Sequence, residues 1–143
     1  MTVRTSEAVW EGDLKSGQGT MKLGSGAYEG QYSFASRFEQ APGTNPEELL
    51  AAAHAGCFSM AFSLGLTQAG YPPRRIHTTA RVHLEKSDGG FQIPRIELAT
   101  DADVPGLDEA KFRQLADEAK RNCPVSKLFK GADISLAAKL SKS

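Results

Sequence analysis

The sequence has no excess of charge of either sign, because 17 Lys and Arg residues balance 17 Asp and Glu residues and the formal net charge is zero. A protein that binds nucleic acid or an anionic membrane surface through electrostatics carries a basic surplus. The balance therefore gives no support to nucleic acid as a partner, and we expect none. Charged residues make up 24% and hydrophobic residues 40% of the chain, which is ordinary for a globular protein.

The start of the chain, "MTVRTSEAVWEGDLK", lacks the apolar segment of a secretory signal, so we expect a cytoplasmic protein. Cysteine is scarce, with two in 143 residues. In a reducing cytosol, two cysteines are more often inert, catalytic or redox-active than permanently bridged. The length fits one domain over residues 1–143, without repeats, low-complexity tracts or a long linker.

Motifs for metal and phosphate are also missing. The sequence contains no CxxC and no HExxH, and "GSGAYEG" (24–30) does not match the P-loop pattern. His77 and His83 share the face of a predicted strand but lie six residues apart, which is too far along a strand for one metal ion. The residues therefore give little support to a metal site or to a phosphate-binding loop.

One long apolar run is present, "LLAAAHAGCFSMAFSLGL" over residues 49–66, and its length requires a test as a membrane span. Its many Ala and Gly residues contribute little hydrophobicity. His54, Ser59 and Ser63 interrupt the run, and the glutamates Glu47 and Glu48 adjoin its start. The run is better interpreted as the buried central helix of a globular domain, and we expect no membrane association.

Signals at both ends define this helix. Asn45 is a suitable N-cap and Pro46 suits the first helical position. Glu48 falls at the third position, as in a capping box. The helix is predicted to run to about Ala69, where Gly70 supplies the stop.

Alternating and helical periodicities predict the remaining elements. In the segment 76–86 the apolar face alternates with a polar face, "SDGG" (87–90) is a turn, and 91–104 is the returning strand. Strands are predicted over 3–11, 18–23, 76–86, 91–104 and 133–140, with another within 27–39, and helices over 109–121 and from Pro124 to about Lys130. The inner face of the helix 109–121 is predicted to carry Phe112, Leu115, Ala116 and Ala119. This order indicates an α+β fold, with mainly antiparallel sheets packed on a long central helix.

The two cysteines carry the candidate chemistry. Cys57 lies within the long helix, and Cys123 lies in "RNCPVSK" directly before Pro124, where it is expected to be a helix N-cap. Unpaired backbone N–H groups at a helix start favour a thiolate. A lone cysteine is equally at home as a small buried hydrophobe. The residues alone therefore leave both interpretations open.

A reactive Cys57 needs a cation that stabilises its thiolate, and Arg37 in "ASRFE" is the nearest upstream candidate. Arg37 could also be an ordinary solvated arginine. Glu47, at the second helical position, is free to pair with an arginine, although it would also interact favourably with the helix dipole. Glu47 and Cys57 are ten residues apart, about 15 Å along the helix axis. We therefore hypothesise that a second subunit supplies Arg37 and Glu47 in a two-fold dimer.

His54 lies three residues before Cys57, on nearly the same helix face. This spacing permits a Cys–His nucleophile pair, as in acyl-transfer enzymes. The alternative is a histidine of the core or of an interface, and no third residue that would orient the ring is evident.

The segment "TNPEELLAAAHAGCFSMAFSLGL", followed far downstream by "NCPVSKLF", resembles the OsmC/Ohr family of organic hydroperoxide reductases. "WEGDLKSGQGTM" and "YSFASRFEQAPGTNPEELLAAAH" are more similar to its OsmC branch. The resemblance implies an intertwined homodimer of α+β fold and a cysteine-based peroxidase without metal or flavin. By motif position it implies that Cys57 is the peroxidatic and Cys123 the resolving cysteine. It further implies that Arg37 contacts the thiolate and that Glu47 holds Arg37.

The implied reaction reduces organic hydroperoxides, with hydrogen peroxide as a second candidate substrate, through a Cys57 sulfenic acid and a Cys57–Cys123 disulfide. An external dithiol then reduces the disulfide, and the family suggests a lipoyl dithiol or lipoylated protein as this partner. Two other functions are weighed against it. One is a non-enzymatic stress protein that binds a small apolar ligand at a dimer interface, and the other is acyl transfer with His54. Two cysteines far apart in the sequence favour the peroxidase.

Overall fold

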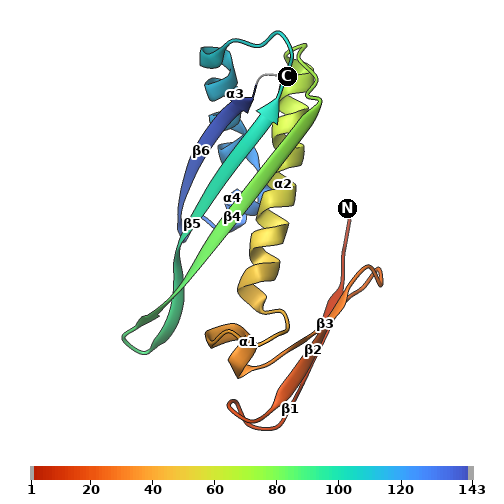
Figure 1. Ribbon diagram of the computed structural model, residues 1–143, viewed down its shortest axis with the longest axis vertical. Helices are drawn as coiled ribbons and strands as arrows, with labels where there is room; N and C mark the ends of the chain where they lie inside the picture. The colour runs from red at the N-terminus through yellow and green to blue at the C-terminus, as the bar shows by residue number, and fades with distance from the viewer. Residues whose placement is uncertain (1, 142–143) are drawn as a thin grey trace. The chain divides into compact units, whose positions relative to one another are not determined.

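The computed structural model describes residues 2–141, in two compact units that divide between Leu49 and Leu50. The first contains a three-stranded antiparallel sheet in the order β1–β2–β3, visible in red and orange in Figure 1. Its strands are β1 (Ser6–Glu11), β2 (Gln18–Leu23) and β3 (Glu29–Tyr32).

A glycine on the middle strand lets two aromatic rings meet across this small sheet. Trp10 of β1 and Tyr32 of β3 both pair with Gly19, and their ring centroids lie 5.4 Å apart. A Cβ atom at Gly19 would lie 2.6 Å from a ring carbon of Tyr32, closer than side chains tolerate. The absent side chain therefore makes room for the aromatic contact, which supplies apolar cover for the strand.

The segment 27–39 was predicted to hold a strand, and the strand is only β3. The residues that follow form a short helix, α1 (Phe34–Phe38). Its start is fixed by a reciprocal capping box, in which the Ser36 N–H donates to Ser33 Oγ (3.1 Å) and the Ser33 N–H donates to Ser36 Oγ (2.8 Å). Two serines three residues apart therefore terminate the strand and begin a helix.

The long helix α2 (Pro46–Gln68) begins as predicted. The Glu48 N–H donates to Asn45 Oδ1 over 2.7 Å, so Asn45 caps the helix. The rest of the predicted capping box is replaced, because the Glu48 carboxylate accepts from the Thr44 hydroxyl over 2.8 Å. At the other end, Gly70 has a φ of +92°, which suits glycine and stops the helix.

By length and composition α2 could cross a membrane, since its mean hydropathy reaches 1.6 over an 18-residue window. Only 22% of that window is buried within the chain. The helix is apolar all round, and such a helix requires cover on every side.

The second unit contains a three-stranded sheet in the order β4–β5–β6, beside the helices α3 and α4. The pair β4–β5 is antiparallel, whereas β5–β6 is parallel, because α3 and α4 connect the two strands and return the chain to the same end of the sheet. Figure 1 traces this connection from teal to blue. The predicted α+β class is confirmed, with one parallel pair. The elements are β4 (Arg75–Ser87), β5 (Gly90–Asp103), α3 (Glu109–Asn122), α4 (Pro124–Leu128) and β6 (Asp133–Ser141).

The core of the second unit lies between this sheet and its helices. Phe62 of α2 meets Phe112 of α3 edge to face, with ring centroids 5.4 Å apart, and both are fully buried. Burying an aromatic ring of this size stabilises the fold by about 1.5–3 kcal/mol. The predicted inner face of α3 is confirmed, since its buried residues are Phe112, Leu115, Ala116 and Ala119.

A chain of hydroxyl groups also joins α2 to the sheet. Ser59 Oγ lies 2.7 Å from Thr78 Oγ1, and Thr78 Oγ1 lies 3.0 Å from Thr100 Oγ1. The three hydroxyl groups satisfy one another where α2 packs on the sheet, so the burial of Thr100 is tolerated.

Candidate active site

The structure brings the two cysteines together in the second unit. Both are free thiols, and the thiol of Cys57 on α2 lies near that of Cys123, which acts on its pKa. Cys123 is fully buried and is the N-cap residue of α4, as predicted, although its side chain makes no capping hydrogen bond. Two thiols in contact can form a disulfide after local adjustment.

The surroundings of Cys57 disfavour its thiolate. Burial raises the pKa of the Cys57 thiol, the Val125 N–H lowers it in part, and the adjacent Cys123 raises it again. None of the groups that act on this pKa within residues 2–141 is a cation. A thiolate at neutral pH therefore requires positive charge beyond these contacts.

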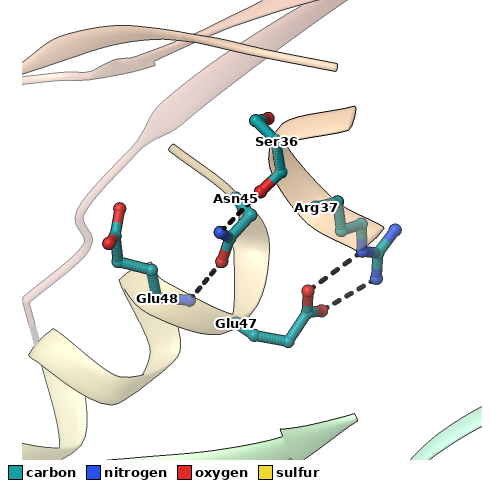
Figure 2. Close-up of polar contacts among 5 residues, drawn as sticks. All are labelled: Ser36, Arg37, Asn45, Glu47 and Glu48. Atoms are coloured by element: carbon teal, nitrogen blue, oxygen red, sulfur yellow. Dashed lines mark hydrogen bonds and ion pairs between the residues drawn. The ribbon is translucent and has the colours of Figure 1, made fainter. Parts of the chain in front are cut away.

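Positive charge is organised in the first unit, by the ion pair of Arg37 and Glu47. Arg37 Nε donates to Glu47 Oε1 over 3.0 Å and Arg37 Nη2 donates to Oε2 over 2.8 Å, a two-pronged contact visible in Figure 2. The side chain of Glu47 is 10% exposed and that of Arg37 is 35% exposed. This contact uses Nε and Nη2 and leaves the Nη1 end, which points away from Glu47 in Figure 2, for another acceptor.

Several contacts fix the segment that carries this ion pair. The Arg37 guanidinium lies 5.3 Å from the ring centroid of Phe38. Asn45 Nδ2 donates to the Ser36 carbonyl over 3.2 Å (Figure 2), and Ser36 Oγ donates to the Thr44 carbonyl over 2.8 Å. Ser36 and Thr44 were not identified from the sequence. Ser36 has one signal in the sequence, its spacing of three residues from Ser33, whereas Thr44 has none.

The four predicted site residues therefore form two pairs. Cys57 contacts Cys123 within the second unit, and Arg37 binds Glu47 within the first. The expected pairing of Glu47 with an arginine is confirmed. The catalytic roles of the four residues remain predictions.

His54 is not paired with Cys57 as the acyl-transfer alternative required. Its Nε2 lies 2.7 Å from Ser126 Oγ on α4, and its ring meets the edge of Phe129 with centroids 5.6 Å apart. Its Nδ1 has no hydrogen-bond partner among residues 2–141, and burial lowers the pKa of His54, which keeps the ring neutral. The sequence alone does not identify Ser126 as the residue that His54 contacts.

A cavity of about 760 Å³ opens beside Cys57 in the second unit. Most of its lining is apolar and comes from α2 and α3, with polar groups of Gln68, Glu118 and Asn122. The lining residues are Cys57, Met60, Ala61, Leu64, Gly65, Gln68, Leu115, Glu118, Ala119, Asn122 and Pro124. A thiol at the wall of an apolar cavity is suited to a substrate with an apolar body.

No group of three or more His, Cys, Asp or Glu side chains that could hold a metal ion is found in the described part of the chain.

Fold and site together define an α+β thiol protein with two adjacent cysteines. The model of the family described as OsmC-like protein matches residues 39–137, and the chain belongs to this family. The chain is 50% identical over 138 residues to peroxiredoxin OsmC of Escherichia coli (strain K12), covering 95% of this chain and 96% of the relative. It is 35% identical over 98 residues to the organic hydroperoxide resistance protein of Xanthomonas axonopodis pv. citri (strain 306), covering 66% of each.

Solved structures agree in fold. The organic hydroperoxide resistance protein OhrB of Bacillus subtilis matches with a TM-score of 0.68 at 25% identity, covering 96% of this chain and 98% of that one. An organic hydroperoxide resistance protein OsmC of Legionella pneumophila matches with a TM-score of 0.75 at 23% identity, covering 97% and 99%. The second likeness concerns the fold alone.

Proposed function

We propose that this cysteine-based peroxidase reduces organic hydroperoxides with Cys57 as the peroxidatic and Cys123 as the resolving cysteine. Hydrogen peroxide is a second proposed substrate. The observation that carries the proposal is that the two thiols lie close enough for Cys123 to act on the pKa of Cys57, which places a second sulfur beside the reactive one. Two adjacent thiols allow a sulfenic acid to be captured as a disulfide.

In the first step the Cys57 thiolate attacks the distal oxygen of the hydroperoxide. The O–O bond breaks, Cys57 becomes a sulfenic acid, and the released alkoxide takes up a proton, equivalent to the one that the thiol lost on ionisation, to leave as the alcohol. We assign Arg37 the role of stabilising the thiolate and of holding the peroxide, because a guanidinium offers several donors in one plane. Glu47 orients Arg37 through the two-pronged contact.

In the second step the Cys123 sulfur attacks the sulfenic sulfur, a disulfide forms, and water leaves. An external dithiol then reduces the disulfide by exchange. We propose a lipoyl-type dithiol, free or on a lipoylated protein, as this reductant. The protein itself supplies two thiols and needs no cofactor for either step.

The apolar cavity beside Cys57 supports an alkyl or aryl hydroperoxide as the substrate. Met60, Leu64 and Leu115 can take up the hydrocarbon body while the peroxide group meets the thiol. Dispersion and burial then favour such a substrate over a small polar peroxide.

The simplest test measures the first turnover of the reduced protein. With one equivalent of cumene hydroperoxide we expect the peroxide to be consumed and peptide mapping by mass spectrometry to find a Cys57–Cys123 disulfide. Dihydrolipoamide should then restore both thiols. A reduced protein that consumes no hydroperoxide would falsify the proposed function.

We further propose that the protein is cytoplasmic. We also propose that its single domain, residues 1–143, works as a homodimer. The support for the dimer is the exposed face of α2, where Met60 and Leu64 are 77% and 58% exposed. Gly56 on the same face has open space around it, so another helix can approach closely. A second copy of this chain can cover the face and bring its own Arg37–Glu47 pair.

The exposed face gives a testable prediction. Leu64→Asp should convert the dimer to a monomer in sedimentation equilibrium, because an unpaired carboxylate would be buried at the interface. Thr79→Asp, on an exposed position of β4, is the matched control and should leave the dimer intact. A wild-type protein that is monomeric and fully active would contradict the dimer.

A further inference from the structure

A buried hydrogen bond joins the two helices that carry the cysteines. His54 Nε2 lies 2.7 Å from Ser126 Oγ, and the two residues are 0% and 6% exposed. His54 precedes Cys57 by three residues on α2, and Ser126 follows Cys123 by three residues on α4. Each member of the contact therefore lies about one helical turn from a cysteine.

Packing alone does not account for this contact. A fully buried imidazole must satisfy two nitrogen atoms, and Nδ1 of His54 has no partner among residues 2–141. A buried polar atom without a hydrogen bond destabilises a fold by about 1–3 kcal/mol, and an apolar side chain would avoid that cost. The hydrogen bond that Nε2 of His54 makes is therefore expected to have a role beyond packing.

We propose that His54 and Ser126 are positioning residues, which hold Cys123 within bonding reach of Cys57 and thereby set the rate of disulfide formation. This inference rests on the proposed function. It gives His54 a role in the reaction without contact to the substrate or to the reacting sulfur atoms.

The bond between His54 and Ser126 connects α4 to α2 without involving a reacting atom. The helix has only five residues, and its N-cap Cys123 makes no side-chain capping bond. One connection is the Val125 N–H, which lies near the Cys57 sulfur and lowers the pKa of its thiol. That contact must change when Cys57 is oxidised, since it involves the reacting atom. The bond of His54 to Ser126 involves no reacting atom and can persist through the cycle.

The position of Cys123 matters because two reactions compete for the Cys57 sulfenic acid. In the resolving reaction Cys57–SOH and Cys123–SH give a disulfide and water, within one protein. In the competing reaction Cys57–SOH takes an oxygen atom from a second hydroperoxide, giving a sulfinic acid and an alcohol. The first rate depends on how well the thiol is placed, whereas the second rises with peroxide concentration.

Four variants test the contact, and among them Ser126→Ala removes it while leaving the His54 ring against Phe129. His54→Gln places an amide group near the position of Nε2 and can still bond Ser126, whereas the shorter side chain of His54→Asn cannot reach it. Ser126→Ala removes the other partner. Ser59→Ala is the matched control, because it removes a 2.7 Å hydroxyl contact of α2 with Thr78 of β4, away from α4.

The experiment separates the two steps in a single turnover with cumene hydroperoxide. Consumption of the first equivalent should stay within about two-fold of wild type in all four variants. Disulfide formation is measured by quenching, alkylation and mass spectrometry. Its rate should fall about ten-fold in His54→Asn and Ser126→Ala, because each variant loses one buried hydrogen bond. His54→Gln and Ser59→Ala should form the disulfide within about three-fold of wild type.

The sulfinic fraction of Cys57 gives a second readout, because it should rise with peroxide concentration more steeply in the two slowed variants. The inference is overturned if His54→Asn and Ser126→Ala form the disulfide as fast as wild type. It is also overturned if Ser59→Ala slows the disulfide equally, since the effect would then be general destabilisation. If wild type consumes no peroxide, the proposed function fails first and this inference with it.

Discussion

We expect the Cys57→Ser variant to lose at least about a thousand-fold in kcat/KM for organic hydroperoxides, because a serine hydroxyl is not ionised near neutral pH and cannot replace the thiolate nucleophile. The measurement is the consumption of cumene hydroperoxide under steady-state conditions, with circular dichroism to verify the fold. A Cys57→Ser variant that consumes the peroxide as well as wild type would remove Cys57 from the reaction.

The variant of the second cysteine, Cys123→Ser, should behave differently from Cys57→Ser. We expect it to consume the first equivalent of peroxide at a rate close to wild type and then stop. With no second sulfur, the sulfenic acid meets further peroxide and becomes a sulfinic acid, which mass spectrometry detects as two added oxygen atoms on Cys57. Sustained turnover of Cys123→Ser with a dithiol would instead show that Cys123 is dispensable.

The second large effect is expected at the Arg37–Glu47 pair. Burial raises the pKa of the Cys57 thiol, so the thiolate fraction at neutral pH is small without a nearby cation. An adjacent opposite charge lowers a pKa by about 1–3 units, so Arg37→Gln should lower the rate at neutral pH about 10- to 1,000-fold. Because the thiolate is the reactive form, the pH–rate profile of Arg37→Gln should move to higher pH. Stopped-flow measurement of the first step between pH 5 and 10 tests this shift, with the range chosen as roughly the span in which a cysteine titrates.

Two further variants show whether geometry matters as well as charge. Arg37→Lys keeps the charge but cannot form the two-pronged contact with Glu47, so its rate should lie between those of wild type and Arg37→Gln. Glu47→Gln should lower the rate while Arg37 keeps its charge. Arg81→Gln, a change of an exposed arginine on β4, is the control and should leave the profile in place. If the pH–rate profile of Arg37→Gln does not move, Arg37 does not stabilise the Cys57 thiolate.

Local chemistry allowed much of the fold to be predicted. Asn45 and Pro46 mark the start of α2 and Gly70 marks its end, because capping and left-handed backbone depend on single residues. The alternation of apolar and polar residues along β4 likewise follows from the pleat of a single strand, whichever strand pairs with it. Cys123 was placed at a helix start from its position before Pro124 for the same reason.

Contacts between distant residues could not be predicted in this way. The helix α1 was missed because its five residues follow a strand directly and are too few for a periodicity to emerge. The parallel pairing of β5 with β6 depends on how the intervening helices return the chain. The contact of Cys57 with Cys123 and that of His54 with Ser126 join α2 to α4 in the same non-local way. For the first of these only the family resemblance gave a basis, and the second had none.

The crossover between β5 and β6 also determines when the chemistry becomes available during synthesis of the chain. Cys123 lies within that connection, and α3 is held to β6 by the Lys120 ammonium, which donates to the Ile134 carbonyl over 3.4 Å. Ile134 and Leu136 of β6 pack against the core that contains Cys123. A nascent chain therefore carries Cys57 before Cys123 is packed in place, and under the proposed mechanism only molecules whose β6 has docked can recycle an oxidised Cys57.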